Sequence, residues 1–326
     1  MQNLHDDSID ILAIETAAST KDDRGIIEKK IELIKQIRER ERFNKIELYD
    51  PYPFQVKFHG TGIDCNQRLL MAGNRTGKTQ SGACETAIHA LGGDHYPSWW
   101  SGRRFDKPTV CFVGGHSTES VRDISQEALL GTPGDPDAAG TGMIPRDRII
   151  KTERKPGVPN AVSVAMVRHA SGGTSYIYFK PYLGASSLPE AWMGRSIDFA
   201  WLDEEPPREV YSQAVTRTLD RKGMVFMTFT PENGMTETVA SFINDLKPRQ
   251  SLTTASWDDA SENVKTLIHK TPGHLSEMMM DQVLASYPPH ERNMRRDGQP
   301  SIGSGLVFPV PEEKIMCEPF VIPEDW

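Results

Sequence analysis

A chain of 326 residues is long enough to bury one large core, with or without a smaller appended unit. Its composition, 37% hydrophobic and 25% charged, is that of a globular protein and excludes disorder along the whole length. The formal net charge of -8 argues against a surface that is basic throughout, although local basic patches remain possible. Since no run of about 18 apolar residues occurs and the first residues are polar and acidic, we expect neither a membrane span nor a secretory signal.

Basic residues gather at three places, and the four cysteines are scattered without a Cys-x-x-Cys pair. Such cysteines are typical of reduced thiols in a cytoplasmic protein. Each basic cluster by itself is more often a solvated face than a nucleic-acid contact. The clusters are Arg103, Arg104 and Lys107; Arg146, Arg148, Lys151, Arg154 and Lys155; and Arg292, Arg295 and Arg296.

The amino-terminal part of the chain predicts a polar tail followed by one helix. Residues 1–24 show no periodicity. Over residues 25–45, isoleucines recur at helical spacing among many charged residues, which predicts an amphipathic helix that packs one stripe against another surface. These isoleucines are Ile27, Ile31, Ile34 and Ile37. Pro51 and Pro53 then break the pattern and begin the main domain.

The main domain alternates short apolar strands with helical segments. This alternation predicts an α/β fold with a mainly parallel sheet that is covered by helices on both faces. Near the middle, two strands flank Ser171-Gly172-Gly173 and predict an antiparallel hairpin. The predicted strands are 68–71, 109–113, 161–168, 175–179, 199–202 and 225–228, and the predicted helix is 79–91.

A glycine-bearing loop follows the first predicted strand. In the P-loop pattern G-x-x-x-x-G-K-[ST], backbone amides wrap a phosphate while the lysine and the hydroxyl reach the terminal phosphates and Mg²⁺. Gly77, Lys78 and Thr79 fit this pattern, whereas Ala72 stands at the first glycine position and Gly73 follows it. The strand–loop–helix context supports the match. The predicted nucleotide-binding residues here are Ala72, Gly73, Asn74, Arg75, Thr76, Gly77, Lys78 and Thr79.

A pair of acidic residues follows the strand 199–202. A carboxylate at that position, Asp203, can hold the Mg²⁺-bound water shell beside Thr79. Glu204 can polarise the water that attacks the γ-phosphate. Acidic pairs at strand ends are common by chance, but a P-loop upstream makes this pair a strong indication of ATP hydrolysis. We expect Glu205, before two prolines, to be an ordinary loop residue.

Two weaker signals concern the strand 225–228 and the segment before the P-loop. Thr228 and Thr230 end the strand, where small hydroxyl groups can bond to the γ-phosphate region or to Glu204. Gln55 carries one donor and one acceptor, which match the adenine edge. Without the other motifs, Thr228 and Thr230 would indicate only a strand that ends at a proline, and Gln55 would be an ordinary surface glutamine.

Together these residues resemble the large terminase subunit of tailed bacteriophages, the ATPase that drives genomic DNA into preformed capsids. Three ordered motifs carry the resemblance: residues 71–79, the run Trp201-Leu202-Asp203-Glu204-Glu205-Pro206-Pro207, and Thr228-Phe229-Thr230-Pro231. Flanking similarity extends it from about Tyr52 to the carboxyl end. The resemblance implies a RecA-like fold of the ASCE class of P-loop NTPases, action in the host cell cytoplasm and the cofactors ATP and Mg²⁺. It also implies partners: double-stranded DNA, the portal protein, the small terminase subunit, and other copies of the chain in a ring, usually a pentamer.

The resemblance assigns a role to each matching position. Lys78 and Thr79 correspond to the Walker A phosphate and Mg²⁺ ligands, Asp203 to the Walker B aspartate and Glu204 to the catalytic glutamate. Thr228 and Thr230 correspond to the coupling motif, and Gln55 to the adenine-recognising glutamine. The predicted metal ligands are therefore Thr79 and Asp203, and the predicted catalytic residues are Glu204, Lys78 and Arg75.

The arginine finger stays open between three residues. Some family members carry an arginine within Walker A, where this sequence has Asn74 followed by Arg75. Others supply one from a neighbouring subunit, from just before Walker B, where Arg195 is near but not aligned. Arg217 is the third candidate.

Four segments follow from these motifs. We predict an N-terminal helical arm at 1–45, a P-loop ATPase core at 46–250, a lid or helical subdomain at 251–302, and at 303–326 a linker toward a nuclease domain. The family's nuclease is a ribonuclease-H-like domain with two metal ions. Because the chain stops before its first aspartate is expected, we expect no nuclease activity from these residues.

Two other functions remain as alternatives. The run Asp203-Glu204-Glu205-Pro206 with an upstream glutamine also resembles a DEAD-type helicase, but the sequence after Pro231 is too short for the second RecA-like domain that such an enzyme needs. A regulatory P-loop protein that binds nucleotide without turnover is the other alternative, and the Glu204 carboxylate argues against it.

Overall fold

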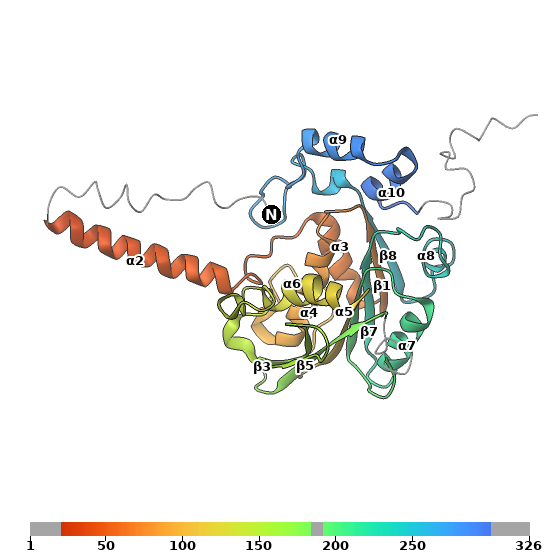
Figure 1. Cartoon of the computed structure of the whole chain (residues 1–326), viewed down its shortest axis with the longest axis horizontal. Coiled ribbons are helices and arrows are strands. Elements are labelled where there is room, and N and C mark those ends of the chain that lie inside the picture. Colours follow the sequence, from red (N-terminus) through yellow and green to blue (C-terminus); the bar gives the residue numbers. More distant parts are fainter. Residues whose placement is uncertain (1–20, 184–191, 301–326) are drawn as a thin grey trace, which may run out of the picture.

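An eight-stranded sheet forms the centre of the molecule, which the computed structural model describes over residues 21–183 and 192–300. The strand order is β3-β4-β5-β2-β6-β7-β1-β8 (Figure 1). From β5 to β8 neighbouring strands are parallel, whereas β3, β4 and β5 are antiparallel at one edge. The strands are β1 Gln67–Ala72, β2 Val110–Gly115, β3 Ile149–Arg154, β4 Val162–Arg168, β5 Thr174–Pro181, β6 Phe199–Asp203, β7 Met224–Phe229 and β8 Gln250–Ala255. The predicted α/β class, the mainly parallel sheet and the hairpin are confirmed.

Alternate residues of the central strands pack into two separate cores, one on each face of the sheet. In β6, Phe199 and Trp201 belong to one core, and Ala200 and Leu202 belong to the other. β1 and β7 alternate in the same way. Because both faces are buried, these strands are mainly apolar instead of alternating with polar residues, although β1 also carries the buried Arg68, and such apolar runs can be recognised in the sequence.

Helices cover the two faces in separate layers. The core on one side contains side chains of α3, α4 and α6, and the core on the other contains side chains of α7 and α8. Two further helices, α9 and α10, lie together above one end of the sheet (Figure 1). The helices are α2 Lys21–Phe43, α3 Pro53–Gly60, α4 Lys78–Leu91, α5 Thr118–Ser120, α6 Glu127–Leu130, α7 Arg208–Thr218, α8 Glu237–Ile243, α9 Glu277–Ser286 and α10 Arg292–Asp297.

Two edge strands were not predicted. β8 pairs with β1 along its whole length, so the sheet continues to Ala255, past the predicted core boundary at residue 250. Its sequence Gln-Ser-Leu-Thr-Thr-Ala holds one large apolar residue, because an edge strand buries little of its surface. β3, at the other edge, is mostly exposed and carries charged side chains, whereas the residues of β8 are mostly intermediate or buried. Neither strand has the apolar run by which the inner strands were recognised.

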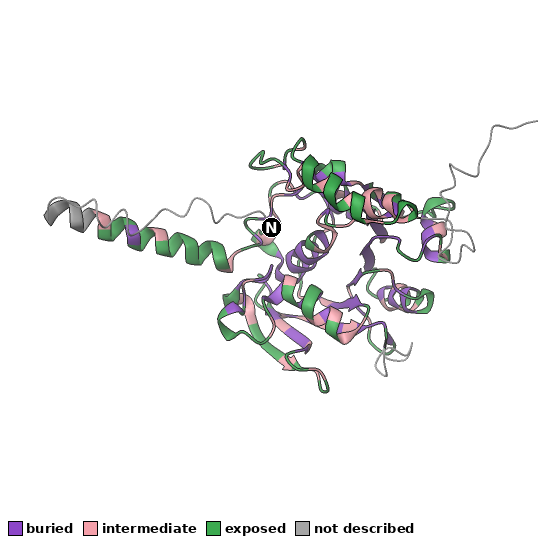
Figure 2. Ribbon diagram, turned by 45° about the horizontal axis from the view of Figure 1, so that its top comes forward, coloured by how far each residue is buried: buried purple, intermediate pink, exposed green. Residues whose placement is uncertain are grey.

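The helix α2 projects from the body of the molecule as a single arm (Figure 1). Most of its described side chains are exposed, as Figure 2 shows, and Leu33 and Ile37 are among them. The rest of the predicted arm, residues 1–20, and the predicted linker lie outside the described residues. No helix within the described ranges has the length and apolar character to span a membrane.

Candidate active site

The predicted site residues meet at the carboxyl ends of three adjacent parallel strands. The order β6-β7-β1 places the ends of these strands side by side. β1 leads into the P-loop, β6 ends at Asp203, and Thr228 and Thr230 lie at the end of β7. Ligands of open parallel sheets bind at such an edge. The structure therefore brings the Walker A, Walker B and coupling motifs together.

The P-loop spans the residues between Ala72, the last residue of β1, and Lys78, the first residue of α4. Gly77 has φ 90°, a left-handed conformation that favours glycine. Gly73 is needed for another reason, because a Cβ there would lie 2.1 Å from the carbonyl oxygen of Arg296 in α10. Ala72 has no positive φ, so an alanine serves at this position.

Lys78 lies over the loop with its ammonium group turned inward. Its Nζ donates to the carbonyl oxygen of Gly73 at 2.7 Å. Burial lowers the pKa of Lys78 to about 8, against the opposing effect of the nearby carboxylates of Glu204 and Asp203. A partly desolvated ammonium group inside a loop of backbone amides is suited to bind phosphate oxygens.

Thr79 and Asp203 form an oxygen-only pair across the site. The Thr79 hydroxyl lies 3.2 and 3.3 Å from the two Asp203 carboxylate oxygens, and the Thr228 hydroxyl donates to the same carboxylate at 2.7 Å. Within the described ranges, no group of three or more His, Cys, Asp or Glu could hold a metal. One hydroxyl and one carboxylate fit Mg²⁺, which retains waters and takes its other ligands from phosphates.

Asp203 is almost fully buried, and this affects its titration. Burial, with a smaller effect from Glu204, raises the pKa of Asp203 to about 7, although hydrogen bonds from Thr228 and Thr79 oppose the rise. A cation beside the carboxylate would favour its ionised form. In the free protein, burial therefore imposes a free-energy cost on the ionised form of Asp203, and a bound Mg²⁺ can offset this cost.

Replacing Asp203 should reveal this cost as a pH-dependent gain in stability. Because the folded pKa lies above the unfolded value, wild type loses stability as pH rises from about 4 to about 7. We expect Asp203→Asn, without Mg²⁺ or nucleotide, to melt several degrees above wild type at pH 8 and close to wild type at pH 4.5. Melting temperatures across this range measure it. A difference that stays constant with pH would contradict the assignment.

Glu204 adopts a backbone conformation that is unusual for its residue type. Its φ is 64°, and its backbone N–H donates to the carbonyl oxygen of Thr228 at 3.1 Å. Left-handed non-glycine residues cost on the order of 1–3 kcal/mol and concentrate at functional sites. Partial burial raises the pKa of Glu204, with Lys78 opposing the rise, while the residue still exposes part of its surface to solvent. A carboxylate with a raised pKa beside the phosphate cradle is suited to accept a proton from water.

The coupling motif joins the Walker A and Walker B segments by side-chain bonds. Thr230 Oγ1 lies 2.8 Å from both the Asn74 side-chain oxygen and the Ala72 carbonyl oxygen. Thr228 Oγ1 accepts from the indole N–H of Trp201 at 2.8 Å while it donates to Asp203. A movement of the P-loop would therefore act directly on β7.

Gln55 lies against the P-loop in α3. Its Nε2 donates to the carbonyl oxygen of Gly77 at 3.2 Å, and its Oε1 accepts from the backbone N–H of Tyr52 at 2.8 Å. The side chain is 3% exposed. The predicted proximity to the nucleotide loop is thus present, and its role toward adenine stays a prediction.

The three arginine candidates occupy different places. Arg75 is exposed in the P-loop with φ 64°, and its carbonyl oxygen accepts from His274 at 2.8 Å. Arg195 lies over the ring of Tyr178 in β5, with its guanidinium carbon 4.7 Å from the ring centroid. The Arg217 carbonyl oxygen bonds to Ile197, just before β6 begins, at the end of the sheet away from the P-loop.

Sequence reasoning missed the contacts that residues 255–296 make with the P-loop. The backbone N–H of Asn74 donates to the carbonyl oxygen of Arg295 at 2.8 Å, and the indole N–H of Trp257 donates to the Asn74 carbonyl oxygen at 2.7 Å. The first of these contacts joins two backbone atoms, which no residue pattern predicts. Trp257, a tryptophan in a polar segment, was the one available signal.

Comparison with known proteins agrees with this geometry. The chain is 35% identical over 315 residues to the large terminase subunit of Salmonella phage P22, covering 91% of this chain and 60% of that protein. It is 27% identical over 212 residues to the large terminase subunit of Enterobacteria phage LP7, covering 65% of this chain and 42% of that protein. The chain thus spans only part of the length of these relatives.

A solved structure has the same fold. The ATPase domain of the Thermus phage P74-26 large terminase matches with a TM-score of 0.51 at 16% identity, covering 78% of this chain and 96% of that domain. Residues 69–315 match the family model described as terminase large subunit, T4likevirus-type, N-terminal. The chain belongs to the large terminase subunit family.

Proposed function

We propose that this chain hydrolyses ATP and that the hydrolysis drives double-stranded viral DNA into a procapsid. The observation that carries this proposal is the meeting of Lys78, Thr79, Asp203 and Glu204 at one edge of the sheet. A phosphate cradle, an oxygen pair suited to Mg²⁺ and a carboxylate with a raised pKa are the parts that phosphoryl transfer to water requires. Glu204 separates this proposal from a regulatory nucleotide-binding protein.

Each residue has a distinct part in the proposed reaction. Lys78 and the backbone amides of the loop bind the β- and γ-phosphates, and Mg²⁺ between Thr79 and Asp203 would neutralise charge on the same oxygens. Glu204 orients the attacking water and accepts its proton. Thr230, which bonds to both Ala72 and Asn74, carries the change at the P-loop to β7.

Arginine side chains would supply the positive charge at the phosphates that Lys78 and Mg²⁺ do not. Arg75, exposed on the loop, can reach the phosphates of its own subunit, and Arg195 can serve a neighbouring subunit. The opening that such a neighbour would use is a cavity of about 350 Å³ beside Walker B, lined in part by His116, Tyr182 and Glu205. Arg217, at the opposite end of the sheet, is the least suited of the three.

The partners of the family are likewise proposed for this chain: a portal protein, a small terminase subunit and further copies of this chain in a ring of five in the host cell cytoplasm.

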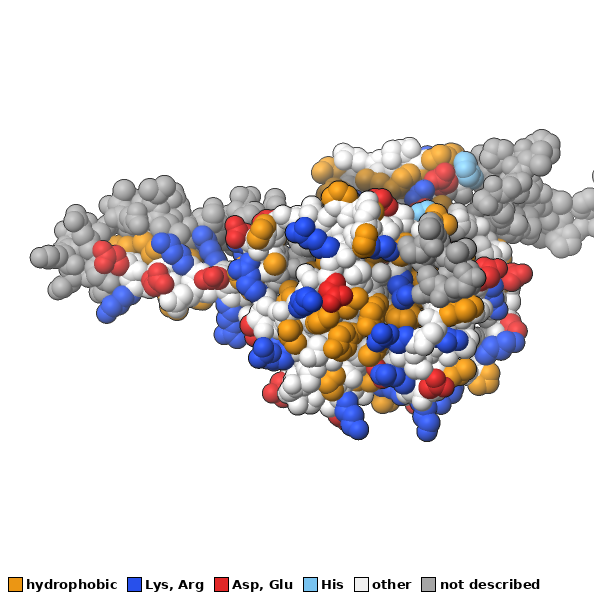
Figure 3. Space-filling view, turned by 60° about the horizontal axis from the view of Figure 1, so that its bottom comes forward, with side chains coloured by type: hydrophobic (Ala, Val, Ile, Leu, Met, Phe, Trp, Pro, Cys, Tyr) orange, Lys and Arg blue, Asp and Glu red, His pale blue; other side chains and the backbone are white. Residues whose placement is uncertain are grey.

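One face of the molecule offers a surface for such contacts. Figure 3 shows the side on which β3 and β5 lie in Figure 1, where hydrophobic side chains gather and Lys and Arg surround them. Two basic side chains lie over aromatic rings of the sheet: Lys180 Nζ is 4.5 Å from the Phe112 ring centroid, and the Arg195 guanidinium carbon is 4.7 Å from that of Tyr178.

Removal of the metal should abolish turnover without abolishing the fold. We expect purified chain to release phosphate from ATP in a single-turnover assay with Mg²⁺, and to release none with excess EDTA because both the phosphate charge and Asp203 then stay uncompensated. Double-stranded DNA should raise the rate, and circular dichroism checks the fold. Bound ATP that is never hydrolysed, with or without DNA, would favour the regulatory alternative.

A further inference from the structure

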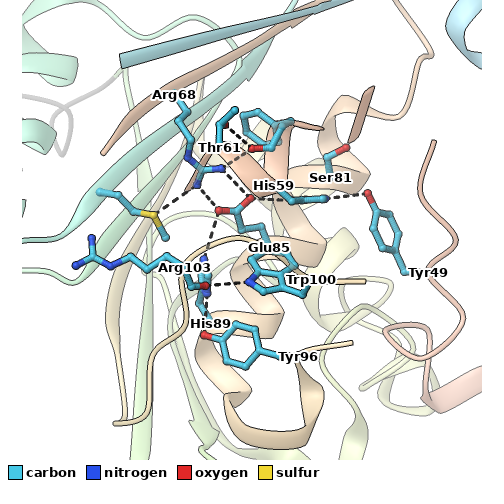
Figure 4. Close-up of polar contacts among 12 residues, drawn as sticks. Tyr49, His59, Thr61, Arg68, Ser81, Glu85, His89, Tyr96, Trp100 and Arg103 are labelled. Atoms are coloured by element: carbon cyan, nitrogen blue, oxygen red, sulfur yellow. Dashed lines mark hydrogen bonds and ion pairs between the residues drawn. The ribbon is translucent and has the colours of Figure 1, made fainter. Parts of the chain in front are cut away.

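A fully buried carboxylate lies in the middle of α4, away from the phosphate cradle. Glu85 has no exposed surface, and neither do the three residues that surround its oxygens, His59, Arg68 and His89 (Figure 4). His59 Nδ1 lies 2.7 Å from Glu85 Oε2, and His89 Nε2 lies 3.3 Å from Oε1. Arg68 bonds to both oxygens. We call these four residues the Glu85 cluster.

The hydrogen bonds define the protonation of the Glu85 cluster. Burial alone would raise the pKa of Glu85, but Arg68 and the bonds from the two histidines hold it well below its usual range. An ionised carboxylate only accepts, so His59 Nδ1 and His89 Nε2 both donate. Their other nitrogens then accept from tyrosine hydroxyls, His59 from Tyr49 at 3.2 Å and His89 from Tyr96 at 3.0 Å. One carboxylate and one guanidinium group balance each other, and burial lowers the pKa of His89.

The members of the Glu85 cluster come from different elements. His59 belongs to α3, Arg68 to β1, and Glu85 and His89 to α4. Arg68 also donates to the Phe58 carbonyl oxygen at 2.9 Å, and its guanidinium carbon lies 4.9 Å from the Phe58 ring centroid. Buried polar groups that satisfy one another specify a single arrangement of the elements that carry them. The cluster therefore sets how α3 lies against β1 and α4.

This arrangement concerns the nucleotide site through α3. Gln55 and His59 are four residues apart in this helix, so they lie on the same face. At one end of α3, Gln55 bonds to Gly77, immediately before α4, and at the other end His59 bonds to Glu85 within α4. The two contacts fasten α3 along the P-loop helix at two points. Without the His59 contact, the end of α3 that carries His59 loses its bond to Glu85, so the helix can tilt and change how Gln55 lies against Gly77.

We propose that His59 and Glu85 are positioning residues for base recognition, which hold Gln55 at the place where it selects adenine over guanine. The inference rests on the proposed ATP site and on Gln55 as the residue that contacts the base. Neither positioning residue touches the nucleotide. Both act through the seating of α3, whereas Lys78 and the loop amides bind the phosphates independently.

The test compares nucleotide affinities of His59 variants of the full chain. His59→Leu removes the donor to Glu85, and His59→Asn keeps an N–H close to the position of Nδ1. Tyr49→Phe is the matched control, because it removes the outer hydrogen bond of His59, together with a bond to Ser81, and leaves the bond from His59 to Glu85 in place. The ratio of the dissociation constants for GTP and ATP, measured with Mg²⁺ at 4 °C, reports base selection. The affinity for tripolyphosphate, which has no base, reports phosphate binding by the P-loop.

We expect His59→Leu to lower the ATP-over-GTP preference about tenfold, the value of about one hydrogen bond, with tripolyphosphate affinity unchanged. His59→Asn and Tyr49→Phe should keep most of the preference. In a Gln55→Ala background, His59→Leu should have no further effect, since the two act in series. If His59→Leu does not fold, His59→Gln, whose longer amide displaces the donor, carries the same expectation.

The outcomes separate this inference from the proposed function. Wild type that binds neither nucleotide would overturn the proposed site together with the inference. Wild type that binds both equally would overturn base selection by Gln55, and with it the inference, but not the phosphate site. Wild type that prefers ATP, combined with a folded His59→Leu or His59→Gln that keeps the full preference, would overturn the inference alone. Equal losses of ATP, GTP and tripolyphosphate affinity would also overturn it, because a general weakening of the fold predicts that result.

Discussion

Glu204→Gln should reduce the rate of ATP hydrolysis by about 10²- to 10⁴-fold, the usual contribution of a positioned general base. Glutamine has nearly the same shape and can keep the backbone bond to Thr228, so the loss would come from the missing proton acceptor. ATP affinity should stay close to that of wild type, because Lys78 and the loop amides are untouched. Single-turnover phosphate release measures the rate, and equilibrium binding measures the affinity.

Glu205→Gln is the matched control for this experiment. It makes the same chemical change one residue further on, where the carboxylate bonds to Asn233 and Thr236 and lies outside the phosphate cradle. We expect its hydrolysis rate to stay within a few-fold of wild type. A Glu204→Gln protein that hydrolyses as fast as wild type would refute the proposed mechanism, whatever Glu205→Gln does.

Local patterns predicted the site because its chemistry is local. A phosphate cradle has to be built from consecutive residues between a strand and a helix, so residues 72–79 announce it in the sequence. Asp203 and Glu204 follow an apolar strand directly, and the buried strands β1, β6 and β7 are apolar on both faces. The parallel order of these strands then brought the separate motifs together.

The rest of the site depends on contacts between distant parts of the chain. Glu85 and His89 meet within α4 itself, four residues apart, but His59 resembles an ordinary helical residue in the sequence, and only the packing of α3 on α4 brings it to Glu85. The same holds for α10, whose carbonyl oxygen at Arg295 meets the P-loop. β8 escaped prediction because an edge strand does not need an apolar sequence. Burial and long-range pairing were the missing information.

The choice among the arginines illustrates a further limit. The sequence offered Arg195, which is near Walker B but not aligned with the family's arginine, and Arg217 as a third candidate. In the structure, the Arg217 carbonyl oxygen bonds to Ile197 just before β6 begins, at the end of the sheet away from the P-loop. Position along the chain therefore said little about distance from the phosphates. Arg75, by contrast, is carried by the loop itself, with an exposed side chain.

Glu85→Gln should destabilise the protein by about 3–5 kcal/mol, the usual cost of removing one partner of a buried ion pair. The Arg68 guanidinium group would remain fully buried, beside Phe58 and Phe226, without a counter-charge. Within the described residues its Nε lacks a hydrogen-bond partner, and its other contacts, to the Phe58 carbonyl oxygen and the Met224 sulfur, carry no negative charge to compensate the loss. Chemical denaturation at pH 7.5, fitted for the main unfolding transition, measures the change in unfolding free energy.

A paired replacement distinguishes the lost charge from lost packing. In the double variant Arg68→Met with Glu85→Leu, no charge remains unpaired, and hydrophobic pairs of similar volume often replace buried ion pairs without loss. We expect this variant to recover at least half of the stability that Glu85→Gln loses, although the two histidines lose a bond each. If the double variant were as unstable as Glu85→Gln, the hydrogen bonds to the histidines, and not the Arg68 charge, would be the main stabilising contribution of Glu85.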